Sequence, residues 1–127
     1  MLWKPDEELD LNNAFNDMQN ISEHERISLI EYLRMHKFYL EKGRGVSISN
    51  SEAYFSWKEY VEEPTLFSFK RHNFEKETGI AWPRAFFVII NLWDILKKFD
   101  PERKKEISID DAVVEFIKHK EWHDVYR

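Results

Sequence analysis

The stretch RAFFVIINLWDILKKF, from Arg84 to Phe99, decides the fold class. Its apolar residues surround nearly the whole circumference of a helix, whereas a surface helix carries a single apolar stripe. We therefore expect a central helix over 84–99, with neighbouring helices covering more than one of its faces. Trp93 should be the residue of this helix whose truncation costs most stability, because replacing a buried aromatic ring with alanine destabilises a domain by about 3–5 kcal/mol.

The rest of the chain also has helical periodicity. Apolar residues recur at spacings of three and four, and the alternation typical of strands is missing. Ser22, Ser49 and Ser108 each start a capping-box pattern, with an acidic residue three positions later. The pattern predicts further helices over 5–19, 22–42, 49–63, 65–78 and 108–122, with Pro64 ending the third of these five and Gly79 the fourth.

We accordingly predict an all-α fold, a single compact bundle of about six helices around the apolar helix 84–99. The 127 residues, 43% of them hydrophobic and 34% charged, suffice for one core, so residues 1–127 are expected to form a single helical domain. The chain has no cysteine, which excludes disulfides, cysteine-ligated metals and a cysteine nucleophile. Without a signal peptide pattern or a long apolar run, we expect a cytoplasmic protein that does not enter membranes.

Charge is distributed unevenly along the chain. Residues 1–63 carry 7 basic and 13 acidic side chains, whereas residues 64–127 carry 12 and 11. An acidic chain lacks the positive surface that general nucleic-acid binding requires. The sequence therefore favours protein partners over nucleic acid.

Aromatic residues are unusually abundant, with five Trp, five Tyr and ten Phe. Either these rings fill a small helical core, or some of them are exposed as anchors for a partner. Trp3, Trp57, Trp82 and Trp122 are the candidate anchors, because they lie near segment ends or on polar helices. Our leading hypothesis is a non-enzymatic interaction module, an adaptor, inhibitor or regulatory subunit that binds another protein or itself through these aromatic anchors and the acidic residues of the N-terminal half.

Two alternatives remain open. Glu115, His119 and His123 are spaced four apart on the last predicted helix and can share one face, as metal ligands on helices do, so the first alternative is a metal-dependent enzyme or a metal-binding protein. Histidines near a helix C-terminus are also explained by the helix dipole. As a third hypothesis, Lys70 and Arg71 lie among phenylalanines and could bind single-stranded nucleic acid.

Other motifs give no site. The segment from Phe99 to Asp111 resembles an EF-hand loop, but Lys104 and Lys105 stand where oxygen ligands and a glycine turn are needed. We expect neither calcium binding nor another cofactor. No phosphate-binding loop or nucleophile motif occurs, so no catalytic residue is predicted.

Overall fold

The computed structural model describes residues 10–19, 21–98 and 106–126. Every regular element in these ranges is helical, so the prediction of an all-α fold is confirmed. The chain divides into two units, residues 1–60 and residues 61–127. Within the described ranges, no helix combines the length and the apolar character needed to cross a membrane.

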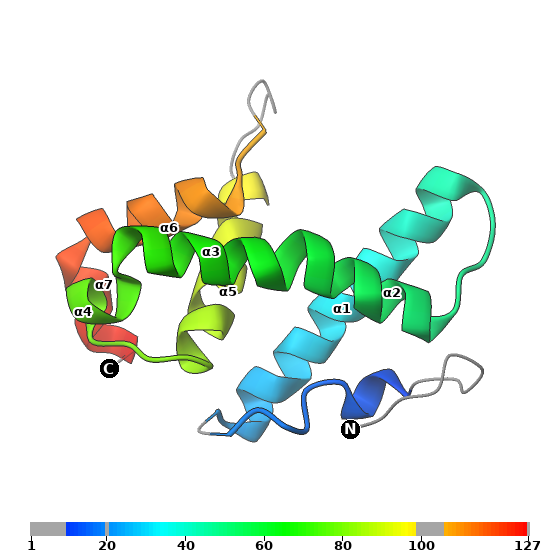
Figure 1. The fold of residues 1–127 in the computed structure, drawn as a ribbon, viewed down its shortest axis with the longest axis horizontal. Coiled ribbons are helices and arrows are strands. Elements are labelled where there is room, and N and C mark those ends of the chain that lie inside the picture. Colours follow the sequence, from blue (N-terminus) through cyan, green and yellow to red (C-terminus); the bar gives the residue numbers. More distant parts are fainter. Residues whose placement is uncertain (1–9, 20, 99–105, 127) are drawn as a thin grey trace. The chain divides into compact units, whose positions relative to one another are not determined.

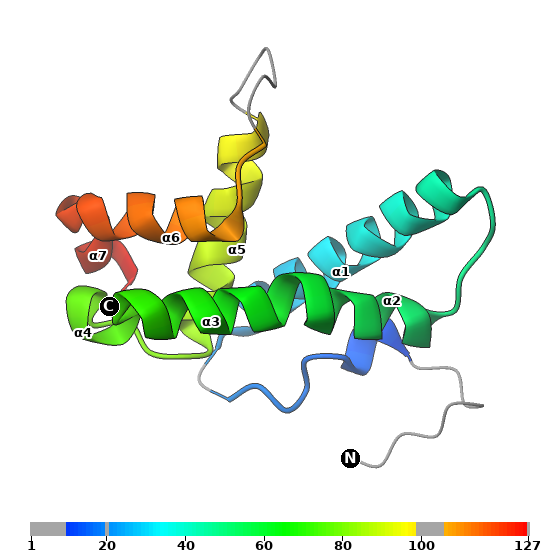
Figure 2. The same cartoon turned by 45° about the horizontal axis from the view of Figure 1, so that its top comes forward.

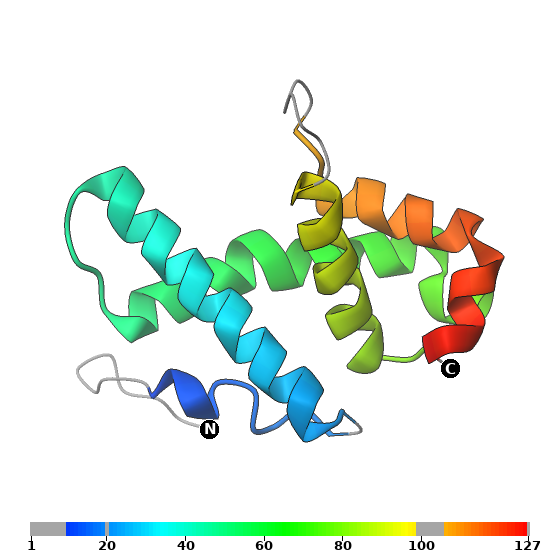
Figure 3. The same cartoon turned by 180° about the vertical axis from the view of Figure 1, so that it is seen from behind.

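Unit 1 is built on one long helix. Its elements are the 3₁₀ turn η1 (Leu11–Asn13), α1 (Glu23–Arg44) and α2 (Asn50–Trp57). Both η1 and α2 pack against α1 (Figure 1). Seen from behind, α1 crosses in front of α2 (Figure 3). The buried apolar residues of this unit are Leu11, Phe15, Leu29, Ile30, Leu33, Ile48, Ala53 and Trp57.

The cap predicted at Ser22 is present at the start of α1. The Ser22 hydroxyl oxygen accepts the backbone N–H of Glu25 at 3.1 Å, and the Glu25 carboxylate accepts the backbone N–H of Ser22 at 2.9 Å. At the other end, Gly45 has φ 72°, a left-handed conformation that glycine adopts with little strain. These local interactions fix both ends of the longest helix.

The predicted helix over 5–19 is wrong within its described part. Leu11 and Phe15 are buried as its apolar spacing required, but only Leu11–Asn13 form a turn of 3₁₀ helix. The Asp10 carboxylate accepts the backbone N–H of Asn12 at 2.9 Å. Short polar side chains that bond nearby backbone compete with helix formation, and this segment is rich in them.

Unit 2 contains five α-helices in the described residues. They are α3 (Glu63–His72), α4 (Phe74–Thr78), α5 (Arg84–Lys98), α6 (Ile109–Lys118) and α7 (Lys120–Tyr126). The π-helical turn η2 (Lys58–Glu62) precedes them and carries the boundary between the units. Helix α6 packs against α3 and α5, and α4 and α7 also contact α6 (Figure 2). The core of the unit therefore forms around α6 and the first half of α5.

Three predicted helix boundaries are wrong. Pro64 does not end a helix, because it lies in the first turn of α3, where its missing N–H is tolerated. Asn73 takes φ 52° and separates α3 from α4, although Gly79 ends the second piece as expected. At His119 (φ −94°, ψ 81°) the backbone leaves the helical region, which separates α6 from α7.

Helix α5 is buried mainly in its first half. Its buried residues are Ala85, Phe86, Val88, Ile89 and Ile90. Trp93 is only half-buried, its indole N–H donates to the carbonyl of Ile107 at 2.7 Å, and the Lys97 ammonium lies 3.6 Å from the ring centre. Trp93, which we expected to be the costliest residue of this helix to truncate, is thus partly exposed, whereas Phe86 has no exposed surface.

Candidate interaction groove

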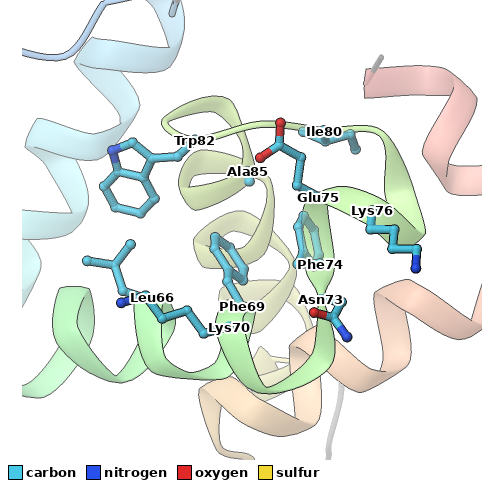
Figure 4. A pocket seen from close by; sticks show the side chains of 10 residues that line it. All are labelled: Leu66, Phe69, Lys70, Asn73, Phe74, Glu75, Lys76, Ile80, Trp82 and Ala85. Atoms are coloured by element: carbon cyan, nitrogen blue, oxygen red, sulfur yellow. The ribbon is translucent and has the colours of Figure 1, made fainter.

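A groove of about 590 Å³ lies beside Trp82 in unit 2 (Figure 4). It lies where the second half of α3, α4 and the start of α5 meet. The residues that line it are Leu66, Phe69, Lys70, Asn73, Phe74, Glu75, Lys76, Ile80, Trp82 and Ala85. Its size lies within the range of ligand and side-chain pockets in proteins.

The groove has an apolar floor and aromatic walls. Phe74, Ile80 and Ala85 form the floor and are at most 2% exposed. Phe69 stands between Trp82 and Phe74 (Figure 4), stacked on Phe74 at 4.4 Å and edge-on to Trp82 at 6.4 Å between ring centres. These ring contacts pack the two aromatic walls of the groove against each other.

Charged side chains stand at the rim of this groove. Lys70 comes from the last turn of α3, and Glu75 and Lys76 come from α4. All three are exposed, and Figure 4 shows the two lysines at opposite ends of the hollow. An apolar centre with a mainly basic rim favours an apolar group flanked by negative charge.

The four tryptophans predicted as anchors have different surroundings. Trp82 is half-buried and lines the groove. Trp57 is only 2% exposed, with Phe15 and His36 edge-on to its ring, so the expectation of an exposed anchor at this position is wrong. Trp3 lies outside the described residues.

Trp122 lines a second, smaller cavity of about 190 Å³ in unit 2. Its ring is stacked on His119 at 4.0 Å and lies 6.0 Å from Phe116. The other lining residues are Val88, Asn91, Leu92, Ile95, Phe116, Val125 and Tyr126. Half-buried Trp122 thus belongs to the wall of a shallow apolar hollow.

The residues predicted as metal ligands do not share a helix face, because α6 ends at Lys118. His119 bonds two carboxylates, Glu115 at 2.8 Å and Glu121 at 3.1 Å, and these bonds, Glu115 first, raise the pKa of His119. Buried His123 donates from Nε2 to the Phe116 carbonyl at 2.9 Å. Among the described residues, no three His, Asp or Glu side chains are grouped to hold a metal.

A serine, an aspartate and a histidine meet between α3 and α6. Ser68 Oγ donates to Asp110 Oδ1 at 2.7 Å, and His72 Nε2 donates to the same oxygen at 3.0 Å. These bonds, that from Ser68 first, lower the pKa of Asp110. Ser68 is 2% exposed and donates to a carboxylate that also accepts from His72, so the cluster ties α3 to α6.

The basic residues of the nucleic-acid hypothesis are both exposed, but the rings near them are not equally available. Phe67 is 69% exposed, whereas Phe74 is 1% exposed and stacked on Phe69. Lys70 belongs to the rim of the groove. Single-strand binding needs a series of free ring faces along a basic track, and only Phe67 offers a largely open ring in this segment.

Sequence reasoning did not identify Leu66 and Phe69 as functional candidates. Phe67 and Phe74 have the spacing of one helical stripe, but Phe74 is buried whereas Phe67 is 69% exposed. Leu66, Phe69 and Asn73 also follow spacings of three and four, and this neighbouring stripe is the signal that could have located the groove.

A comparison of the chain with models of known protein families, with characterised proteins and with solved structures finds no match.

Proposed function

We propose that this chain is a non-enzymatic protein-interaction module, whose groove beside Trp82 binds a bulky apolar side chain from an acidic segment of a partner protein. The observation that supports this function is the combination of a preformed aromatic hollow with lysines at its two ends. Interface energy concentrates in such central pockets, especially where Trp or Tyr takes part.

The magnitudes assign different roles to the floor and the rim. Burying one Leu, Ile or Phe side chain contributes about 1.5–3 kcal/mol. An exposed ion pair to Lys70 or Lys76 contributes about 0–1 kcal/mol and weakens with salt. The apolar side chain therefore supplies most of the affinity, while the lysines select acidic flanks and speed association.

A peptide-display selection against the purified chain tests this proposal. The selected peptides should share a bulky apolar residue flanked by Asp or Glu. Leu66→Asp places a charge in the groove wall and should weaken binding of a selected peptide at least about tenfold. Phe67→Asp is the matched control. Phe67 is next to Leu66 in the sequence, but its side chain is 69% exposed and does not line the groove. Equal binding by both variants would refute the assignment.

Titration with single-stranded DNA and RNA separates this function from nucleic-acid binding. At physiological salt we expect nothing tighter than non-specific affinity, a Kd of about 10⁻⁴–10⁻⁶ M. A tighter complex that Lys70→Ala and Arg71→Ala weaken would instead favour the nucleic-acid hypothesis.

A further inference from the structure

The outer face of α1 carries a seam of residues at heptad spacing, of which Ile27 and Phe38 are apolar and the other four are polar. We use this name for six residues spaced by alternating steps of three and four: His24, Ile27, Glu31, Arg34, Phe38 and Glu41. The inner side of α1 packs through Leu29, Ile30 and Leu33, which are at most 6% exposed. Along the outer face Phe38 is 60% and Ile27 45% exposed.

When two copies of this helix run antiparallel, the side chains of one seam complement those of the other. In an antiparallel helix pair, residues whose numbers add up to one constant face each other. A constant of 65 brings Ile27 opposite Phe38, Glu31 opposite Arg34, and His24 opposite Glu41. Every layer then joins an apolar residue to an apolar one, or a carboxylate to a basic side chain.

We infer that the outer face of α1 binds a second copy of this chain in an antiparallel, two-fold symmetric helix pair. The symmetry makes each of these layers occur twice, as in any isologous interface. The two layers of Ile27 and Phe38 supply the apolar contact, and the central layers of Glu31 and Arg34 fix the register. A parallel pair would place Glu31 against Glu31 and Arg34 against Arg34, so the charges exclude it.

Contacts inside unit 1 hold two of the charged seam residues in place. Arg34 Nη2 donates to Asn12 Oδ1 at 2.5 Å, and the other guanidinium N–H groups can reach a carboxylate. Glu41 Oε2 accepts the backbone N–H of Ile48 at 3.1 Å, which leaves its second oxygen for a partner. Holding these side chains reduces the entropy lost when the two copies meet. Met35, 38% exposed, lies beside the seam and adds apolar surface.

Charge reversal tests the pairing by sedimentation equilibrium of the full chain. The wild-type chain should form a dimer. Glu31→Arg and Arg34→Glu should each weaken dimerisation at least about tenfold, because each places like charges together twice. The combined variant Glu31→Arg/Arg34→Glu should restore it, and Glu59→Arg, an exposed reversal outside the seam, is the matched control. Circular dichroism checks that every variant stays helical.

Disulfide crosslinking tests the register independently, because the natural chain has no cysteine. Ile27→Cys/Phe38→Cys should give a covalent dimer on mild oxidation. Within one chain the two positions lie about 16 Å apart along the helix, too far for an internal disulfide. Ile27→Cys alone should stay uncrosslinked.

The inference is overturned if the wild-type chain is monomeric at its highest soluble concentration, if the charge swap fails to restore dimerisation, or if Ile27→Cys alone crosslinks. None of these results bears on the groove, because peptide binding to Leu66→Asp is measured separately.

Discussion

Individual aromatic residues divide between core and surface in a way that their abundance does not reveal. Trp57 and Phe86 are buried, whereas Phe38 and Phe67 are more than half exposed. Composition counts rings, but burial depends on which side of a helix meets a neighbour. Among the described residues, the exposed rings belong to phenylalanines and tyrosines (Phe38, Tyr39, Phe55, Tyr60 and Phe67) rather than to the tryptophans predicted as anchors.

Phe86 should contribute more to stability than Trp93. Phe86→Ala leaves a cavity in a fully buried site and should lower the free energy of unfolding by about 3–5 kcal/mol. Trp93→Ala should lower it by about half as much, because the ring is already partly in water and loses chiefly its bond to Ile107 and the contact with Lys97. Denaturant melts of both variants measure the difference. A larger loss for Trp93 would mean that α5 is buried along its second half.

At the scale of helices, the sequence predicted where helices begin better than where they are interrupted. A serine followed three residues later by an acidic residue satisfies backbone groups locally, so the starts at Ser22 and Ser108 are as expected. The break at Asn73 occurs at a residue that tolerates left-handed backbone but does not require it. The break at His119 follows from the packing of α7 on Phe116. Only tertiary contacts decide such breaks, and the groove depends on the one at Asn73.

The corner between α6 and α7 should be sensitive to pH through His119. Its folded pKa lies above the ordinary 6.5, so its contribution to stability is complete below pH 6.5 and is lost as pH rises through the folded pKa. His119→Gln should therefore reduce the free energy of unfolding more at about pH 5 than at about pH 9. Urea melts at both pH values measure this difference.

The cause of this pH effect is the carboxylate of Glu115, the largest contributor to the raised pKa. Glu115→Gln should lower the His119 pKa measured by NMR titration of the ring protons. Salt at about 1 M should shrink the pH effect, because the pair is exposed and a Debye length of about 3 Å screens it. An unchanged His119 pKa in Glu115→Gln would show that another group is responsible.

At the scale of the whole chain, the two proposed surfaces lie on different units. The α1 seam belongs to unit 1, with 7 basic and 11 acidic residues, and the groove to unit 2, with 12 and 13. The more acidic unit carries the surface that pairs with itself, while the nearly neutral unit carries lysines for an acidic partner. A dimer would present two grooves, so a partner with two acidic segments would gain affinity through effective concentration.

The prediction of a single domain can be tested through the cooperativity of unfolding. The boundary at residues 60 and 61 lies inside η2, and helical residues run from Asn50 to His72 through α2, η2 and α3. Breaking a helix in its middle creates new unsatisfied ends, so we expect both units to unfold together.

Leu33→Ala in unit 1 and Ile89→Ala in unit 2 each remove a fully buried side chain and should each destabilise by about 2–5 kcal/mol. Native-state hydrogen exchange measures the free energy of opening at each amide. In each variant, this free energy should fall by the same amount for the most protected amides of α1 and of α5. If Leu33→Ala weakens protection in α1 and leaves α5 unchanged, the units unfold separately and the chain comprises two domains.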